Sequence, residues 1–576
     1  MQLGAAANRS GYSGQSGVPL HGEERPGGDW LVTSASYAFA LAFGLYICIS
    51  IFPVDFIFPP VSPGIPPTSD LIQHITGQRY FIADAWRWPL LEVPSLNFPD
   101  GVHIGFTDSI PALALPLKAL SFLLPQGFHG FGLWYAFAWI MQPVAAVWCL
   151  RATGERRLAP ALCIAVVAIA MPTWWSRFFH ASLTGHFLIW FALGASLYLT
   201  RDNRPAQWVA AALLQIVILL VHPYLWAMTA VFLLGVPLTH LINGDARWRL
   251  SLPASLLAVA ASVVVASVLG YFGAYGGGGF GIYGMNLLSP FWPAGSSLLP
   301  FELKMFTTSQ DSGWEGYQYL GAGVLFGLVS VIVIRRGAIF SDLRAYAGFV
   351  LAALFLVVFS MSSNIGIGSR IYENAYATTG LSSFVESLFA HFRSSGRMFW
   401  PVGYLLVLAV VAGLARVRGD VLRVGLLIAV AALQFADNSK ARAALANNLR
   451  NGYPGWEWLF DVAKMREAVG SASALRIYPR WECVPGDKIP LEHSGLIQLL
   501  SIASETVVPV NTMYVARWHT MRNCNDENEV AEPLAPGETR VLGPTVREAY
   551  TPRVPDAEKY CQPIDPFMVC RRPAEQ

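Results

Sequence analysis

Asp70, Gln73 and His74 are the first residues in the chain whose types and spacing suggest chemistry, within the stretch PPTSDLIQHITGQRYFIADAWRWP that covers residues 66–89. Side chains three and four residues apart project from the same face of a helix. A carboxylate that is partly shielded from water and has a histidine neighbour can act as a general base near neutral pH. We therefore expect Asp70 to be a base with His74 beside it. The alternative is that Asp70 only stabilises the start of a helix through the helix dipole.

Asp108 is a second candidate acid, in the segment GFTDSIP. It precedes an apolar stretch with helical character, so it can serve as a helix cap. It can equally orient a substrate hydroxyl or act as the base in place of Asp70. The sequence leaves both roles open.

Histidines and arginines recur where apolar segments end, in SRFFHASLTGH, LLVHPYLW and SLFAHFRSSGRMFW. Ionisable groups at membrane depth are costly and usually line a functional cavity. The residues in question are Arg177, His180, His186, His222, Tyr224, Arg393 and Arg397. None of these segments contains a metal-binding motif such as HExxH, so no metal is expected.

Arg393 and Arg397 are four residues apart at the start of an apolar segment. Guanidinium groups bind phosphate well, so this pair, together with Arg177, is expected to bind a phosphate at the level of the lipid headgroups. Anchoring to anionic lipid is the alternative. Tyr283, Asn286 and Glu315 supply the aromatic and hydrogen-bonding groups that grip a sugar, although an aromatic membrane belt contains similar residues.

The chain that positions these residues is strongly apolar. Of its 576 residues, 54% are hydrophobic and only 13% are charged, which indicates an integral membrane protein. A helix needs roughly 20 apolar residues to cross a bilayer. We expect about eleven transmembrane helices, near residues 32–53, 129–150, 158–175, 187–200, 207–221, 223–241, 250–271, 317–334, 345–361, 398–415 and 421–435.

Five short connections are rich in arginine: 151–157, 201–204, 243–249, 335–344 and 416–420. The positive-inside rule assigns these connections to the cytoplasm. With an odd number of crossings, the N-terminus then lies inside and the C-terminus lies outside. The net charge of +2 gives no indication of a nucleic-acid partner.

Four cysteines, Cys483, Cys524, Cys561 and Cys570, fall in the polar C-terminal segment. An even set in a segment assigned to the outside favours two disulfides, formed in an oxidising compartment. A zinc site is the alternative, but the segment has no CxxC spacing. We favour the pairs Cys483–Cys524 and Cys561–Cys570, although the sequence leaves the connectivity open.

The chain is expected to have three parts. Residues 1–30 are rich in glycine and serine and predict a disordered cytoplasmic segment. Residues 31–438 form a transmembrane domain with a long outer loop at 54–128, which includes a helix that lies along the membrane interface. Residues 439–576 predict a small periplasmic domain of α/β or α+β type.

This layout resembles the C-type glycosyltransferase fold, called GT-C. The motifs SDLIQH, FTDSIPALALP, LVHPY, GGFGIYGMNLLSP, WEGYQYLG and FRSSGRMFWP are also similar to those of a family of uncharacterised bacterial multi-pass membrane proteins. That closer resemblance covers roughly residues 30–440 and, more loosely, the C-terminal segment with VNTMYVAR and its cysteines.

The fold resemblance implies a glycosyltransferase that takes a sugar from a polyprenyl-phosphate donor and passes it, with inversion, to a hydroxyl of a glycan or lipid acceptor. Asp70 matches the acid that deprotonates the acceptor, and Arg393 and Arg397 match groups that bind the lipid phosphate. The loop has no Asp-x-Asp, which implies a reaction without metal or other cofactor. A lipid or polysaccharide transporter and a membrane scaffold without catalytic activity are the alternatives.

Overall fold

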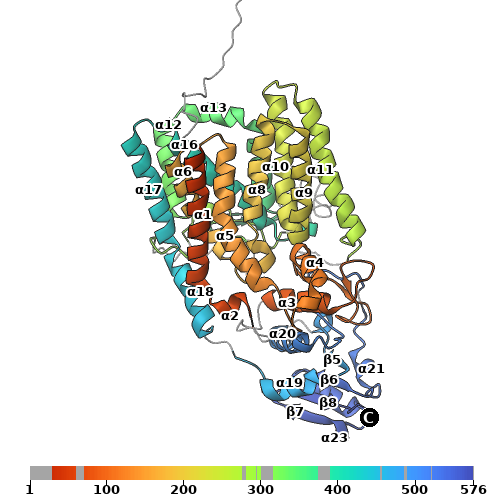
Figure 1. Ribbon diagram of the computed structural model, residues 1–576. Helices are drawn as coiled ribbons and strands as arrows, with labels where there is room; N and C mark the ends of the chain where they lie inside the picture. The colour runs from red at the N-terminus through yellow and green to blue at the C-terminus, as the bar shows by residue number, and fades with distance from the viewer. Residues whose placement is uncertain are drawn as a thin grey trace, which may run out of the picture.

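The computed structural model describes residues 29–59, 70–274, 281–293, 295–299, 315–373, 390–453, 457–484, 489–520 and 522–574, and most of them are helical. Long helices run side by side in a bundle, and the C-terminal domain lies beyond one end of it (Figure 1). The segment 1–28, which covers nearly all of the predicted disordered N-terminus, lies outside the described residues.

Each predicted transmembrane segment coincides with a helix or a pair of helices in the described residues. They are α1 (Asp29–Ile51), α5 (Phe131–Ala152), α6 (Leu158–Ile169) with α7 (Pro172–Trp175), α8 (Phe187–Arg201), α9 (Pro205–Val221), α10 (Pro223–Ile242), α11 (Trp248–Leu269), α12 (Ala322–Arg335), α14 (Ala347–Ser360), α16 (Trp400–Ala415) and α17 (Asp420–Asp437).

Six helical segments within the described residues are long and apolar enough to cross a membrane: Trp30–Ile51, Phe131–Ala152, Leu158–Trp175, Pro223–Ile242, Trp248–Leu269 and Ser395–Ala415. Helix α12 and the following α13 (Ala338–Ala345) form a pair bent by 111°. Helices α8, α9 and α14 are apolar but shorter. A helix of 15 residues such as α8 is only about 22 Å long, less than the ~30 Å of a hydrocarbon core. The structure thus supports six candidate spans, and the prediction of eleven crossings is only partly supported.

The five arginine-rich connections gather at one end of the bundle, where α13 lies (Figure 1). Arg201 donates a hydrogen bond to the carbonyl of Ala152 at 3.2 Å, and Arg247 donates to the carbonyl of Arg201 at 2.7 Å. Arg416 donates to the Asp342 carboxylate at 2.8 Å. Because these bonds join connections from different parts of the chain, the arginines that predict the cytoplasmic side lie on one side of the bundle.

The long loop after α1 lies at the opposite end. It contains α2 (Val54–Ile57), α3 (Asp70–Ala83), the antiparallel pair β1 (Glu92–Val93) and β2 (Val102–His103), and α4 (Pro111–Ala119). Helix α3 lies between the bundle and the C-terminal domain (Figure 1). The predicted interfacial helix corresponds to α4 and the short turn η1 (Ser121–Leu123), whose Phe122 and Leu123 are 78% and 69% exposed.

The C-terminal domain is built on a four-stranded sheet in the order β5-β6-β8-β7, with β5 and β6 parallel and the other neighbours antiparallel. Its strands and larger helices are α19 (Val462–Gly470), β5 (Ala474–Tyr478), α20 (Ile489–Thr506), β6 (Glu538–Leu542), β7 (Cys561–Ile564) and β8 (Phe567–Arg571). The short helices are α21 (Asp526–Val530), α22 (Arg547–Tyr550) and α23 (Ala557–Tyr560). Disulfides join Cys483 to Cys524 and Cys561 to Cys570, which confirms the favoured pairing.

One hydrophobic core joins the first outer loop to the C-terminal domain. Tyr80 and Leu96 of the loop pack in the same buried cluster as Leu475 and Leu499 of the C-terminal domain. The Tyr80 hydroxyl also donates a hydrogen bond to the carbonyl of Val508. The two regions are therefore folded together, although about 400 residues of sequence separate them.

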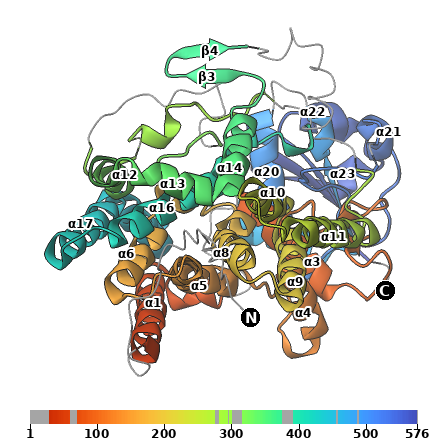
Figure 2. The ribbon, with the colours of Figure 1, turned by 90° about the horizontal axis from the view of Figure 1, so that it is seen from above.

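The remaining elements lie near the edges. Helix α18 (Ser439–Asn451) continues from α17 and packs against α1, where Arg450 donates to the carbonyl of Ser50 at 2.6 Å. The hairpin of β3 (Ile365–Ile367) and β4 (Arg370–Tyr372) lies outside the bundle when it is viewed along the helices (Figure 2). Short 3₁₀ turns are η2 (Ala181–Thr184), η3 (Ser289–Phe291), η5 (Ala390–Phe392), η6 (Ser395–Phe399), η7 (Trp481–Cys483) and η8 (Thr551–Arg553).

Candidate functional site

Asp70 lies in the first turn of α3 and contacts the C-terminal domain. The Tyr514 hydroxyl donates a hydrogen bond to its carboxylate at 3.2 Å, and Gln73 donates to the backbone carbonyl of Tyr514 at 2.9 Å. Burial raises the pKa of Asp70, the Tyr514 hydrogen bond opposes this, and the charge of Asp108 raises the pKa further. Asp70 therefore holds a proton more tightly than an ordinary aspartate does.

The loop that carries Asp108 packs directly against α3 because residue 77 is glycine. A Cβ atom there would lie 2.2 Å from the Thr107 hydroxyl oxygen. The Ser109 hydroxyl donates to the carbonyl of His74 at 2.8 Å, which fixes the loop to the helix. Asp108 itself has a φ of 52°, in the left-handed region that aspartate tolerates better than most residues. This turn brings the Asp108 carboxylate close to His74.

Asp108 is surrounded by histidines from three segments of the chain. Its two carboxylate oxygens lie 3.6 Å from His180 Nε2 and 3.4 Å from His222 Nε2. The other ring nitrogen of His222 accepts a hydrogen bond from the backbone N–H of Tyr224, so its Nε2 carries the proton that faces Asp108. Burial alone would raise the pKa of Asp108, but His222 and His180 outweigh it and hold that pKa well below its usual value.

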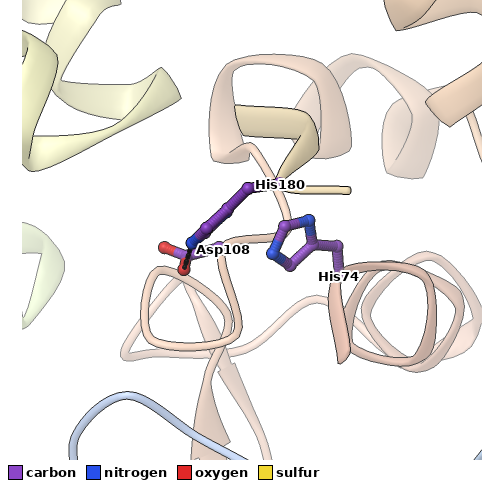
Figure 3. A group of neighbouring side chains, drawn as sticks. All are labelled: His74, Asp108 and His180. Carbon is purple, nitrogen blue, oxygen red and sulfur yellow. Dashed lines mark ion pairs between the residues drawn. The ribbon is translucent and has the colours of Figure 1, made fainter. Parts of the chain in front are cut away.

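His74 and His180 complete this group, which we call the histidine cluster: His74, Asp108, His180 and His222. Figure 3 shows the His74 ring turned toward Asp108 and His180. The His74 side chain is fully buried, and neither of its ring nitrogens has a hydrogen-bond partner among the described residues. Burial lowers the pKa of His74 to about 4, so the ring is neutral at pH 7.

A second group, which we call the arginine cluster, consists of Arg177, Glu315 and Arg397. The Glu315 carboxylate accepts two hydrogen bonds from Arg397, at 2.5 and 2.6 Å, and one from Arg177, at 3.1 Å. Burial would raise the pKa of Glu315, but the two guanidinium groups hold it well below its usual value. The structure thus places Glu315, a predicted sugar-binding residue, between two arginines.

The sequence SSGR positions Arg397. The Gly396 N–H donates to the carbonyl of Tyr283 at 3.0 Å, and Gln318 donates to the carbonyl of Gly396 at 2.7 Å. A Cβ atom at residue 396 would lie 2.6 Å from the carbonyl oxygen of Glu315, so only glycine allows this close approach. The Arg397 guanidinium also lies over the ring of Tyr224, at 5.0 Å from its centroid.

Arg393 differs from the other two arginines. Its guanidinium lies 5.8 Å from the centroid of the Tyr283 ring. Within the part of the chain that the structure describes, no carboxylate lies within ion-pair distance of it. Its positive charge acts on Tyr514, the residue bound to Asp70. Arg393 therefore adds a positive charge that no described acid balances.

The two clusters adjoin each other. The charges of Arg397 and Glu315 act on the pKa of Asp70, and the charge of Asp108 does the same. Asp108 and Glu315 are 12% and 20% exposed at the side chain, so solvent reaches both clusters. The structure thus brings Asp70 together with the arginines found some three hundred residues later in the sequence.

Family models match both regions that build this site. A domain of unknown function (DUF6311) matches residues 41–439, and the DUF6311 C-terminal domain matches residues 464–572. The chain belongs to the DUF6311 family. No curated protein matches it. Both clusters lie in the DUF6311 domain, whereas Tyr514 lies in the DUF6311 C-terminal domain, so the two domains jointly surround Asp70.

Two predicted site residues of the DUF6311 domain, His186 and Asn286, have side-chain hydrogen-bond partners outside the two clusters. The His186 ring is hydrogen-bonded to the Tyr404 hydroxyl at 2.7 Å and packs on Trp400 at the start of α16. The Asn286 amide binds backbone groups of Leu288 and Gly368, which ties the β3–β4 hairpin to its neighbouring loop. Both contacts hold the fold together.

Tyr514 is the site residue that sequence reasoning missed. It lies in VNTMYVAR, a motif that carried the family resemblance without an assigned role. Its ring stacks on Trp481 at 4.3 Å, and Trp481 stacks in turn on His493 at 3.6 Å. Its contact with Asp70 spans 444 residues of sequence, so no local pattern predicts it.

The expectation that no metal is bound depends only on the absence of metal-binding motifs such as HExxH along the chain. His74, Asp108 and His180 are far apart in the sequence, yet each offers a ligand atom and these atoms all lie within 4.8 Å of one another. A search for motifs along the chain cannot detect such a group.

Proposed function

We propose that this DUF6311 protein is a membrane glycosyltransferase that transfers a sugar from a polyprenyl-phosphate donor to an acceptor hydroxyl, with inversion, at the periplasmic face. The observation that carries the proposal is the link between Asp70 and the arginines at one end of an apolar helical bundle. The charge of Arg397 acts on Asp70, Glu315 joins Arg397 to Arg177, and the charge of Arg393 acts on Tyr514, which donates a hydrogen bond to Asp70. Sugar transfer from a lipid phosphate needs a base for the acceptor and cations for the departing phosphate, and the site provides both.

Asp70 is the better base of the two candidate acids. A general base is most effective when its pKa lies near the working pH. Burial raises the pKa of Asp70, whereas His222 and His180 hold that of Asp108 below its usual value. Asp70 takes the proton from the acceptor, and Tyr514 orients its carboxylate. Asp108 remains ionised and positions the histidines.

The arginines differ in how they meet the donor phosphate. Arg177 and Arg397 share the charge of one carboxylate, so together they keep one net positive charge. Arg393 has no such partner among the described acids. We assign the first contact with the phosphate to Arg393, while Arg177 and Arg397 offset the negative charge that grows as the sugar leaves.

The proposal includes a placement in the membrane. We propose eleven crossings with the arginine-rich end in the cytoplasm, as the positive-inside rule favours. The clusters and the C-terminal domain then lie in the periplasm, where the two disulfides are stable. The resemblance to the GT-C fold belongs to the same proposal.

The deciding experiment is the substitution Asp70→Asn. The purified full-length protein is incubated with synthetic polyprenyl-phosphate hexose and pentose donors and with glycan extracted from a deletion strain. We expect the wild type to transfer sugar and Asp70→Asn to be at least about 100-fold slower. The matched control is Asp84→Asn, since Asp84 directly follows α3 and forms an ion pair with Arg87 at 2.7 Å, away from both clusters.

Equal activity of Asp70→Asn and the wild type would contradict the proposal. A transporter or a scaffold then becomes the better interpretation. A transporter moves labelled polyprenyl-phosphate sugar across vesicles without changing it, whereas a scaffold does neither, so a flux measurement separates the two.

A further inference from the structure

Three ring nitrogens of the histidine cluster have no hydrogen-bond partner among the described residues. His74 is fully buried with two ring nitrogens that have no partner among the described residues, and His180 has one such nitrogen, Nδ1. Buried polar atoms in proteins are nearly always hydrogen-bonded, and an unpaired one is costly. A ligand bound among these side chains would satisfy their ring nitrogens.

The chemical nature of the group indicates which ligand fits. Two imidazoles and one carboxylate form the donor set of many catalytic zinc sites. Imidazole nitrogen favours zinc and other transition metals over magnesium and calcium, which prefer oxygen. The cluster is also accessible, since His180 and Asp108 are 15% and 12% exposed at the side chain.

The distances are compatible with a metal site after a small adjustment. Zinc–ligand bonds of about 2.0–2.2 Å at tetrahedral angles put ligand atoms about 3.3–3.6 Å apart. The ligand atoms of His74, Asp108 and His180 lie within 4.8 Å of one another. Side-chain rotations that move these atoms by roughly 1 Å bring them to the spacing of zinc ligands. Gly77 and Ser109 hold the Asp108 loop against α3 and so keep two of the ligands in place.

We propose that His74, Asp108 and His180 bind one divalent transition-metal ion, with Zn²⁺ as the best fit. His222 does not bind the metal itself; its Nε2–H group points at the Asp108 carboxylate and orients that ligand. Three protein ligands leave one position for water or for an oxygen of a substrate. The inference goes beyond the proposed sugar transfer and does not rest on it, because it concerns metal binding by the protein alone.

The test measures metal in the full-length protein, purified in detergent with an affinity tag that contains no histidine and without chelators. We expect about one zinc ion per chain, measured by inductively coupled plasma mass spectrometry. We also expect the chelator-treated protein to give a Co²⁺ absorption spectrum typical of tetrahedral coordination. Asp108→Asn and His180→Ala should each lose the bound metal, and His222→Ala should weaken Zn²⁺ binding by about 10–100-fold.

His240→Gln is the matched control. His240 is also buried, but its ring nitrogens already contact Ser251 and the carbonyl of Thr200, at 3.0 and 3.1 Å. It should keep the full metal content. Asp70→Asn should keep it as well, so a failure of the sugar-transfer proposal would leave this measurement intact.

The proposal is overturned if the folded wild type, as judged by gel filtration, holds no more zinc than His180→Ala and gives no Co²⁺ spectrum. It is equally overturned if zinc binds but both His180→Ala and Asp108→Asn retain it, since the ion is then held elsewhere. The Co²⁺ titration of the wild type keeps the test decisive even if a variant fails to fold.

Discussion

The histidine cluster and the arginine cluster are built on the same plan but are completed to different degrees. Each holds one carboxylate between basic side chains from distant segments. In the arginine cluster, Glu315 accepts hydrogen bonds of 2.5–3.1 Å from Arg177 and Arg397. In the histidine cluster, Asp108 contacts its histidines at 3.4 and 3.6 Å, and ring nitrogens stay unpaired among the described residues. In the arginine cluster, the carboxylate is therefore firmly hydrogen-bonded by its basic neighbours. In the histidine cluster, ring nitrogens are available to bind a ligand.

The strongest test of this comparison removes the charge of Glu315. Glu315→Gln removes the carboxylate that two buried guanidinium groups share, and breaking a buried ion pair typically costs about 3–5 kcal/mol. We expect a large drop in the melting temperature of the detergent-solubilised protein. Asp420→Asn is the control, because Asp420 is 86% exposed and its pair with Arg423 is worth at most about 1 kcal/mol. Equal effects of the two substitutions would remove the distinction.

The second test applies the same change to the histidine cluster. Asp108→Asn removes a carboxylate that lies 3.4 and 3.6 Å from the ring nitrogens of His222 and His180, contacts that are longer than the hydrogen bonds of Glu315. We expect a loss of about 1–3 kcal/mol in the free energy of unfolding, the cost of disturbed buried hydrogen bonds. A loss as large as that of Glu315→Gln would mean that the histidines carry full charge and that the clusters are equivalent.

The pH dependence of stability should separate Glu315 from Asp70. The pKa of Glu315 is lower in the folded protein than in the unfolded chain, so its contribution is present above the unfolded value of about 4.3 and is lost as the pH falls. The pKa of Asp70 is raised, so folding favours its protonated form and stability is lost as the pH rises above about 3.9.

Thermal unfolding of two variants at several pH values, from about pH 4 to about pH 8, checks these signs. Asp70→Asn should melt at a higher temperature than the wild type at neutral pH, with the difference shrinking in acid. Glu315→Gln should show the opposite trend, with its deficit largest at neutral pH. A stability of Asp70→Asn that is unchanged at every pH would show that Asp70 is not perturbed by burial.

The smallest expected effect comes from Tyr514→Phe, which removes one hydrogen bond of 3.2 Å to Asp70. Its cost in stability should be about 0.5–1.5 kcal/mol. Because this bond lowers the pKa of Asp70, its loss should shift the acidic limb of the sugar-transfer pH profile upward. Phe460→Leu, a core change in the same domain, is the control and should leave the profile in place. An unshifted pH profile in Tyr514→Phe would show that the C-terminal domain does not influence the proton affinity of Asp70 through this bond.

Much of the architecture follows from local patterns. The apolar segments predict the helices of the bundle because each must bury its backbone polar groups in hydrogen bonds, and the cysteine count in one polar segment predicts both disulfides. The number of full crossings was less predictable. Helices α8 and α14 match their predicted segments, but with 15 and 14 residues they are shorter than the roughly 20 residues that a crossing needs, so apolar composition alone overstates the number of full spans.

The candidate site was predictable in part. The types of Asp70, Asp108 and the arginines mark them as unusual in an apolar chain, and the structure brings them close together. What the sequence cannot give is which charges neutralise each other. The pairing of Glu315 with Arg397 depends on the close approach at Gly396, and the contact of Tyr514 with Asp70 depends on a core shared between distant regions.

That shared core has a consequence for how the protein is made. The hydrophobic cluster around Tyr80 and the Asp70 side chain both need residues from the last fifth of the sequence. Translation must therefore be complete before the region near residue 70 can reach its final form. A chain that stops early therefore lacks both Tyr514 beside Asp70 and the C-terminal part of the hydrophobic core around Tyr80.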